Sequence, residues 1–230
     1  MSQNSTDELT QRELRLKMAI DIAHELRTPL GGIVGMNELL LTSELDSDQK
    51  QYTETIHESA KTMLQLLTDF VELARLDAGK ITANPESFHL QTLLDECSYG
   101  LRKQLKAHNI NMKISIDPAV PEKITADENS LRNTIIAIVA GATKYVESGT
   151  ITIDARLSTD TKSISFTVTL PPDTVNRNGQ PLFAFMADEG APVLRYDSTW
   201  VRLSIAQRLL KLLNASISVS GNALEFRIPT

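Results

Sequence analysis

The sequence predicts an N-terminal hairpin of two long helices, followed by an α/β sandwich. Apolar residues recur at helical spacing through two stretches in the first 80 positions, and a short polar turn separates them. After about residue 84, short alternating strands are interspersed with amphipathic helices. This pattern is typical of helices packed on one face of a mixed, mainly antiparallel sheet. The predicted domains are therefore residues 1–83 and 84–230.

The composition indicates which kinds of partner the protein can bind and in which compartment we expect it. The 230 residues are 41% hydrophobic and 23% charged, as in ordinary globular proteins. The net charge of −6 argues against nucleic acid or an anionic membrane as a binding surface. The sequence contains no run of 18 apolar residues and no signal-peptide pattern. The single Cys97 has no partner for a disulfide or a metal site. We therefore expect a cytoplasmic protein without a metal of its own.

The first helix is predicted from about residue 7 to residue 43. Its apolar face comprises Leu16, Ile20, Ala23, Leu26, Leu30, Ile33, Val34 and Leu40. His24 follows Ala23 by one position and should therefore lie at the edge of this face, accessible from outside. Pro29 has no backbone N–H and should bend or loosen the helix one turn further on.

The second helix is predicted to begin at a capping box formed by Asp46 and Gln49 and to end before Gly79. Its apolar residues continue the helical periodicity of the first helix. Two helices of this length cannot bury an apolar stripe by pairing only with each other, so we expect a homodimer with a four-helix bundle. In the alternative, the C-terminal domain covers the stripe in a monomer.

The remaining pattern alternates helices and strands in the second domain. Helices are predicted at 91–107, at 126–145 with Asp127 as the cap, and at 200–214. Strands are predicted at 110–116, 150–157, 163–170, 216–220 and 223–228, the last two forming a hairpin about Gly221.

The segment His24-Glu-Leu-Arg-Thr-Pro-Leu30 resembles the H-box of two-component histidine kinases, and residues 70–79 resemble the end of their dimerisation hairpin. The resemblance implies that His24 is the phospho-acceptor and that Glu25 orients or deprotonates it. It also implies that Thr28 positions water for dephosphorylation of a receiver partner, with Arg27 and Pro29 as supporting residues. The alternative is a surface histidine of a coiled coil.

The second domain resembles the ATP-binding domain of the same kinases, which is of the GHKL type. It differs from that family at the positions that bind magnesium and the nucleotide. Asp127 and Arg132 match the start of the family's N-box helix, and Lys144-Tyr145 match its end. Between them, the family's asparagines ligate Mg²⁺ and contact phosphates, whereas this sequence has Ala137 and Gly141. Neither residue offers the side-chain oxygen that a hard cation such as Mg²⁺ needs.

Two further nucleotide-binding elements are altered. The family's Asp-x-Gly-x-Gly loop is replaced by residues 169–175, which contain two prolines and only Asp173 as a remnant. The segment 182–185 resembles the family's phenylalanine box. The next turn of the family binds the triphosphate at the N-terminus of the last helix. Here Trp200 and Val201 should fill the space that the phosphates would occupy, although Arg202 could still bind an anion. Because three elements are altered together, we expect that ATP is not bound.

The function predicted from these features is phosphorelay, as in dimeric histidine phosphotransferases with a vestigial catalytic domain, which the chain resembles. His24 would relay phosphoryl groups between the aspartates of response-regulator receiver domains, and the receiver would bring the Mg²⁺. Three alternatives remain open: a receiver phosphatase that uses Thr28 and Glu25, a non-enzymatic pseudokinase scaffold, and an active kinase with an unusual nucleotide pocket.

The glycine-rich turns after Pro29 are the predicted docking place of the receiver. Residues 31–36 contain Gly31, Gly32 and Gly35, which leave a low surface on the helix. Glycine costs roughly 1 kcal/mol in a helix interior relative to alanine, so three glycines need a compensating reason. The alternative is that they serve local packing or flexibility near the proline. Residues 63–70 of the second helix should supply the facing wall.

Overall fold

The computed structural model describes residues 3–158, 163–176, 179–187 and 198–229, with side chains from residue 10 onward. Contacts divide the chain into two compact units, residues 1–81 and 82–230, and each is described by itself. The sequence-based boundary lies two residues further on. None of the helices in the described ranges is long and apolar enough to cross a membrane.

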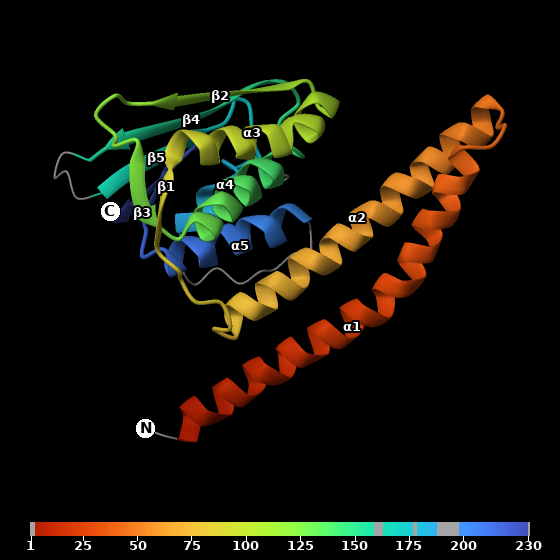
Figure 1. Ribbon diagram of the computed structural model, residues 1–230, viewed down its shortest axis with the longest axis horizontal. Coiled ribbons are helices and arrows are strands. Elements are labelled where there is room, and N and C mark those ends of the chain that lie inside the picture. Colours follow the sequence, from red (N-terminus) through yellow and green to blue (C-terminus); the bar gives the residue numbers. More distant parts are fainter. Residues whose placement is uncertain (1–2, 159–162, 177–178, 188–197, 230) are drawn as a thin grey trace. The chain divides into compact units, whose positions relative to one another are not determined.

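The first unit is a hairpin of two long helices, α1 (Gln3–Leu41) and α2 (Ser47–Asp77) (Figure 1). Helix α2 begins at the predicted capping box: the Asp46 carboxylate accepts the Gln49 N–H at 2.9 Å, and the Gln49 side chain accepts the Asp46 N–H at 3.2 Å. Gly79 follows the helix with φ +64°, a left-handed conformation that glycine adopts without a steric penalty. At the open end of the hairpin, Lys80 Nζ lies 2.8 Å from Glu13 Oε1.

Helix α1 continues without interruption past Pro29. Proline removes one main-chain hydrogen bond and crowds the preceding turn, so a bend is expected rather than a break. Figure 1 shows that α1 changes direction along its course.

The apolar face predicted for α1 is divided into two seams in the structure. One seam lies inside the hairpin and includes Leu16, Ala19, Ala23 and Leu30, all buried. The second seam, which we term the open seam, consists of large apolar side chains that stay exposed on both helices. Its members are Leu14, Met18, Ile22, Leu26, Ile33, Met36 and Leu40 of α1, and Tyr52, Ile56, Met63 and Phe70 of α2.

The second unit is the predicted α/β sandwich. Its sheet has the order β2-β4-β5-β7-β6, in which β2 is parallel to β4 and the other neighbours are antiparallel. The strands are β2 (Ile110–Ile116), β4 (Gly149–Leu157), β5 (Ser163–Thr169), β6 (Ser216–Ser220) and β7 (Ala223–Pro229). Helices α3 (Leu90–Ala107), α4 (Glu128–Ala142) and α5 (Ser198–Leu212) lie together on one face (Figure 1).

Short elements complete this unit. Strands β1 (Glu86–His89) and β3 (Lys123–Ala126) pair into a separate two-stranded sheet that the sequence did not predict. A 3₁₀ turn, η1, spans Ala184–Ala187. Helix α4 ends three residues earlier than predicted, which leaves Lys144 and Tyr145 in the turn beyond it.

The core of the second unit lies between the sheet and its helices. Phe166 of β5 and Phe226 of β7 are fully buried with stacked rings whose centroids lie 5.1 Å apart. Helix α4 is buried over most of its circumference, as predicted from its apolar composition. Its cap is Asp127, which accepts the Ser130 N–H with one carboxylate oxygen and the Asn84 N–H with the other, both at 2.6 Å. This cap therefore ties the beginning of the domain to α4.

Candidate functional site

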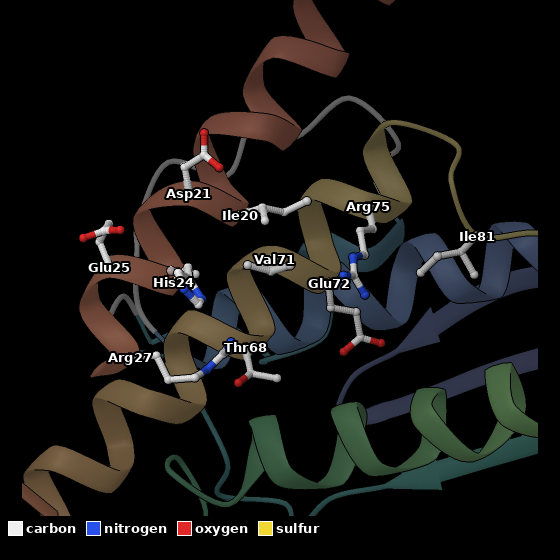
Figure 2. A pocket seen from close by; sticks show the side chains of 11 residues that line it. Ile20, Asp21, His24, Glu25, Arg27, Thr68, Val71, Glu72, Arg75 and Ile81 are labelled. Carbon is white, nitrogen blue, oxygen red and sulfur yellow. The ribbon is translucent and has the colours of Figure 1, made fainter. Parts of the chain in front are cut away.

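His24 lines a groove of about 560 Å³ between the two helices of the hairpin (Figure 2). Ala23 is buried between the helices, whereas His24, one position further, is exposed. The predicted position of His24 at the edge of the buried face is therefore confirmed. The other lining residues are Ile20, Asp21, Ala23, Glu25 and Arg27 of α1, Thr68, Val71, Glu72 and Arg75 of α2, and Ile81.

The His24 ring is open to an approaching group. Figure 2 shows the His24 ring and the Arg27 side chain extending toward α2, while the Glu25 carboxylate points away from the ring. Within the described part of the chain, no hydrogen bond joins Glu25 to His24. The role that the resemblance implies for Glu25 stays a prediction. The geometry itself supplies a solvent-accessible imidazole, which is the nucleophile that covalent phosphoryl chemistry needs.

The groove holds charged groups of both signs. Arg27 and Arg75 both line it, and a guanidinium presents a planar fork of donors that suits phosphoryl or carboxylate oxygens. Burial raises the pKa of the Glu72 carboxyl, and the nearby negative charge of Asp69 raises it further, while Arg75 lowers it. Asp69 is only 6% exposed and accepts a hydrogen bond from Gln65 Nε2 at 2.7 Å. An anionic group could therefore sit beside the imidazole with cationic donors in reach.

The predicted site residues are only partly gathered in this groove. His24, Glu25 and Arg27 line it, whereas Thr28 and Pro29 are exposed on α1 and are not among its lining residues. Four residues correspond to slightly more than one turn, so Thr28 stands about 6 Å further along the helix, toward the hairpin turn. The role proposed for Thr28 in dephosphorylation stays a prediction.

Sequence reasoning missed the contribution of α2 to this groove. Thr68, Glu72 and Arg75 follow one another at helical spacings of four and three, so they share one face of α2. That spacing was visible in the sequence. Their proximity to His24 depends on the register of the antiparallel pairing, which the turn at residues 42–46 sets.

The second candidate site is the region of α4 and α5 that matches the nucleotide pocket of the resembling family. Ala137 and Gly141 are buried on α4. A Cβ atom placed on Gly141 would lie 3.2 Å from Leu203 Cγ and 3.5 Å from Arg202 Cβ of α5. Helix α5 therefore passes directly over Gly141. A side chain at this position would require Leu203 to shift by a few tenths of an ångström, so Gly141 is closely packed beneath α5 and supplies no side-chain oxygen to a metal ion.

The surrounding loops also differ from a nucleotide cradle. The Trp200 ring packs against Phe185, with centroids 4.2 Å apart and planes tilted by 56°. The Asn222 side-chain amide donates to the carbonyl of Pro171 at 3.0 Å and to that of Pro172 at 2.7 Å, which holds this loop in shape. The predicted turn before Trp200 begins at residue 197, which lies outside the described residues.

The two polar residues that the resemblance assigns to this region, Asp173 and Lys144, are both exposed, the latter beyond the end of α4. One observation points the other way: Thr174 Oγ1 is buried and has no hydrogen-bond partner among the described residues. The described residues of this region therefore offer one orphaned hydroxyl, but no magnesium ligand at Ala137 or Gly141.

Comparisons with known proteins cover both units. The family described as "His Kinase A (phospho-acceptor) domain" matches residues 14–79. The hybrid signal transduction protein dokA of Dictyostelium discoideum is 30% identical over 221 residues, which are 92% of this chain and 13% of the relative. The sensory/regulatory protein RpfC of Xanthomonas campestris is 28% identical over 230 residues, covering 94% of this chain and 31% of the relative. The chain thus spans less than a third of either relative.

Solved structures share the fold over nearly the whole chain. Full-length ShkA in complex with AMPPNP matches with a TM-score of 0.68 and 25% identity, covering 93% of this chain and 45% of that chain. The histidine kinase ThkA in complex with the response regulator protein TrrA matches with a TM-score of 0.58 and 18% identity, covering 100% of this chain and 67% of that chain. The second match is a likeness of fold alone.

Proposed function

Because this chain is the core of a two-component histidine kinase, a phospho-acceptor hairpin followed by a domain with the catalytic fold, we propose that it acts as a phosphorelay histidine phosphotransfer protein. In this proposal His24 receives phosphoryl groups from one receiver aspartate and passes them to another, without ATP. The observation that carries it is the close packing of α5 on Gly141, where an added Cβ atom would lie 3.2 Å from Leu203 Cγ and neither Ala137 nor Gly141 offers a side-chain oxygen. His24 is exposed, whereas Ala137 and Gly141 are buried on α4 and offer no side-chain oxygen to a magnesium ion.

The chemical step needs few groups from this chain. A ring nitrogen of His24 attacks the phosphorus of the receiver's aspartyl phosphate, so a P–N bond forms as the P–O bond to the aspartate breaks. The receiver is left with a free carboxylate, and the imidazole shares the developing positive charge between its two nitrogens. Arg27 and Arg75 line the same groove and can stabilise the phosphoryl oxygens during transfer. The receiver supplies Mg²⁺ and the in-line geometry.

A receiver domain is the partner that this chemistry requires. The structural neighbour ThkA is in complex with a response regulator, which supports a receiver as the partner of a hairpin of this fold. The receiver's active-site loops must reach His24, so its body contacts the adjoining turns of α1 and α2. Residues 31–36 of α1 lie in the turns immediately after the acceptor site.

We expect bulky residues at Gly32 and Gly35 to slow phosphoryl exchange with the receiver. A Cβ added at either glycine meets no atom within 4 Å, so Gly32→Leu and Gly35→Leu should leave the chain folded. Their side chains would instead stand in the docking surface. Stopped-flow or quenched-flow transfer assays should show a rate reduced by about tenfold or more, the cost of a poorly packed contact of about 1.4 kcal/mol.

Gly100→Leu is the matched control for the docking prediction. A Cβ at this glycine of α3 also meets open space, but it lies in the second unit. It should exchange phosphoryl groups at the parent rate. If Gly32→Leu and Gly35→Leu behave like Gly100→Leu, the receiver docks elsewhere and the second unit becomes the first candidate.

The proposal includes a homodimer whose interface is the open seam. Side chains such as Met36 and Tyr52 are 67% and 64% exposed in the single chain, and the seam runs along both helices. Isolated exposed apolar residues are common, but a contiguous stripe of this length on a hairpin marks an interface. A second hairpin packed against it completes a four-helix bundle.

Titration with Mg-ATP tests the prediction that the protein does not bind ATP. We expect no saturable heat up to millimolar ATP in isothermal calorimetry of the full chain, because α4 supplies no metal ligand at Ala137 and Gly141. A saturable micromolar isotherm would contradict the proposal. If Thr174→Val then weakened that binding, the orphaned hydroxyl would be identified as part of a working nucleotide pocket.

A further inference from the structure

Strand β2 has an open edge. The five-stranded sheet begins with β2, which pairs with β4 and with no other strand of the described residues. In a parallel pair, the N–H and C=O groups of successive residues point alternately to the two sides. The Asp117 N–H donates to the Ala155 carbonyl of β4 at 2.9 Å, so odd-numbered residues face β4. The main-chain groups of Met112 and Ile114 therefore face the free edge of the sheet.

A groove of about 670 Å³ runs beside the first residues of this strand, between it and α3. Leu105 and Ile110 form an apolar floor and are nearly fully buried, and Met112 is half-buried above them. Tyr99 stands on the α3 wall and is 78% exposed. The groove therefore combines unsatisfied main-chain groups on one side with an apolar floor and an aromatic side chain on the other.

The α3 wall of the groove is cationic. Arg102 and Lys106 both line it, and neither has an ion-pair partner in the parts of the chain that the structure describes. The third charged residue of the groove, Asp95, accepts a hydrogen bond from Gln91 Nε2 at 2.9 Å. The groove thus has a local excess of positive charge in a chain whose net charge is −6. An occupant that carries carboxylates complements it.

The edge lacks most of the features that usually block strand addition. Edge strands are commonly kept short, bent by a bulge, interrupted by proline or protected by a lysine. Strand β2 has seven residues without proline, and its pairing with β4 is continuous from Ile110 to Ile116. Its single lysine, Lys113, alternates with Met112 and Ile114 and so projects to the opposite face of the sheet.

We propose that the edge of β2 and the adjoining groove bind an extended acidic segment of a partner protein, which joins the sheet as a sixth strand. Main-chain hydrogen bonds to Met112 and Ile114 hold the segment in place, as in other cases of strand addition. The residues of the segment that face α3 are alternately apolar and acidic, so that the apolar ones pack on Tyr99 and Met112 and the acidic ones reach Arg102 and Lys106. This recognition is independent of phosphoryl transfer at His24.

The test uses the full chain and a defined probe, the peptide acetyl-Glu-Thr-Val-Thr-Glu-Thr-Val-amide carrying a fluorophore, which presents glutamate and valine in turn on one face of an extended strand. Fluorescence anisotropy should show saturable binding, and the double variant Arg102→Glu, Lys106→Glu should weaken it by about tenfold or more. Lys103→Glu is the matched control, because Lys103 lies on the same helix, is exposed and does not line the groove. This control should bind the peptide like the parent.

Two further measurements identify the mode of binding. A peptide N-methylated at the alternate residues whose N–H groups face β2 cannot donate hydrogen bonds to that strand and should lose binding. Amide exchange at Met112 and Ile114 should slow only with the unmodified peptide. Absence of binding at millimolar peptide, or equal affinity in the charge-reversed and control variants, would overturn the proposal. So would concentration-dependent association of the chain that the double variant abolishes, because a second copy would then occupy the edge.

Discussion

Replacement of His24 by alanine should abolish acceptance of phosphoryl groups from a phosphorylated receiver. The ring supplies the nitrogen that bonds to phosphorus, so its removal leaves no nucleophile, and labelling should fall below detection. Stability should change by less than about 0.5 kcal/mol, because the side chain is exposed outside the buried seam. Labelling with radioactive phosphate and thermal unfolding of the same samples measure both quantities.

His108→Ala provides the matched control for this variant. His108 is also an exposed histidine, but it follows α3 in the second unit. It should be labelled like the parent. Persistent labelling of His24→Ala would end the phosphotransfer proposal. If His24→Ala instead retained only dephosphorylation of the receiver, and Thr28→Ala removed that activity, the phosphatase alternative would replace it.

The double variant Ile56→Glu, Met63→Glu should convert the protein from a dimer to a monomer. Both side chains are about half exposed on α2 and belong to the open seam. In a four-helix bundle each would bury an unpaired carboxylate, at a cost of several kcal/mol. Two such charges should weaken association by about 100-fold or more. Light scattering should then report a mass near 25.4 kDa, the mass of one chain.

Thr62→Glu is the control for the dimer prediction. Thr62 is exposed on the same helix but off the face that carries the open seam, and its hydroxyl donates to the Glu58 carbonyl at 2.8 Å. This variant should stay dimeric. A dimer that survives both charges at Ile56 and Met63 would mean that the seam is covered in another way, as in the monomeric alternative.

Local signals sufficed for much of the fold. The capping box of Asp46 and Gln49 fixed the start of α2, and Gly79 marked its end, because both depend on a few neighbouring residues. The five strands of the main sheet also followed from alternation alone. Strands β1 and β3 did not, since each has four residues and their pairing joins segments far apart in the sequence, Glu86 opposite Ala126.

The two seams of α1 show a limit of periodicity. Leu16, Ala23 and Leu30 share a spacing of seven residues, and Leu26, Ile33 and Leu40 repeat it three residues out of phase. A single broad face and two adjoining narrow ones have the same sequence pattern. Only the position of α2 decides that the first set is buried within the hairpin and the second set is left exposed.

The candidate sites were predictable to different degrees. The motif identified His24 and its place at the edge of the seam, but the contribution of Arg75 and Glu72 required the register of the hairpin. The absence of side-chain oxygen ligands at Ala137 and Gly141 follows directly from the residue types. That Leu203 occupies the space above Gly141 depends on tertiary packing of α5, for which the sequence offers no local signal.

The most direct test of the account offers ATP and a phosphorylated receiver separately to the intact 230-residue chain. One sample receives Mg²⁺ and radiolabelled ATP, and the other receives a receiver domain labelled beforehand with radioactive acetyl phosphate and freed of the excess. Acid-labile, alkali-stable phosphate is then measured on the chain and on His24→Ala. The account predicts label from the receiver only, and none in His24→Ala. Label from ATP that depends on His24 would contradict it.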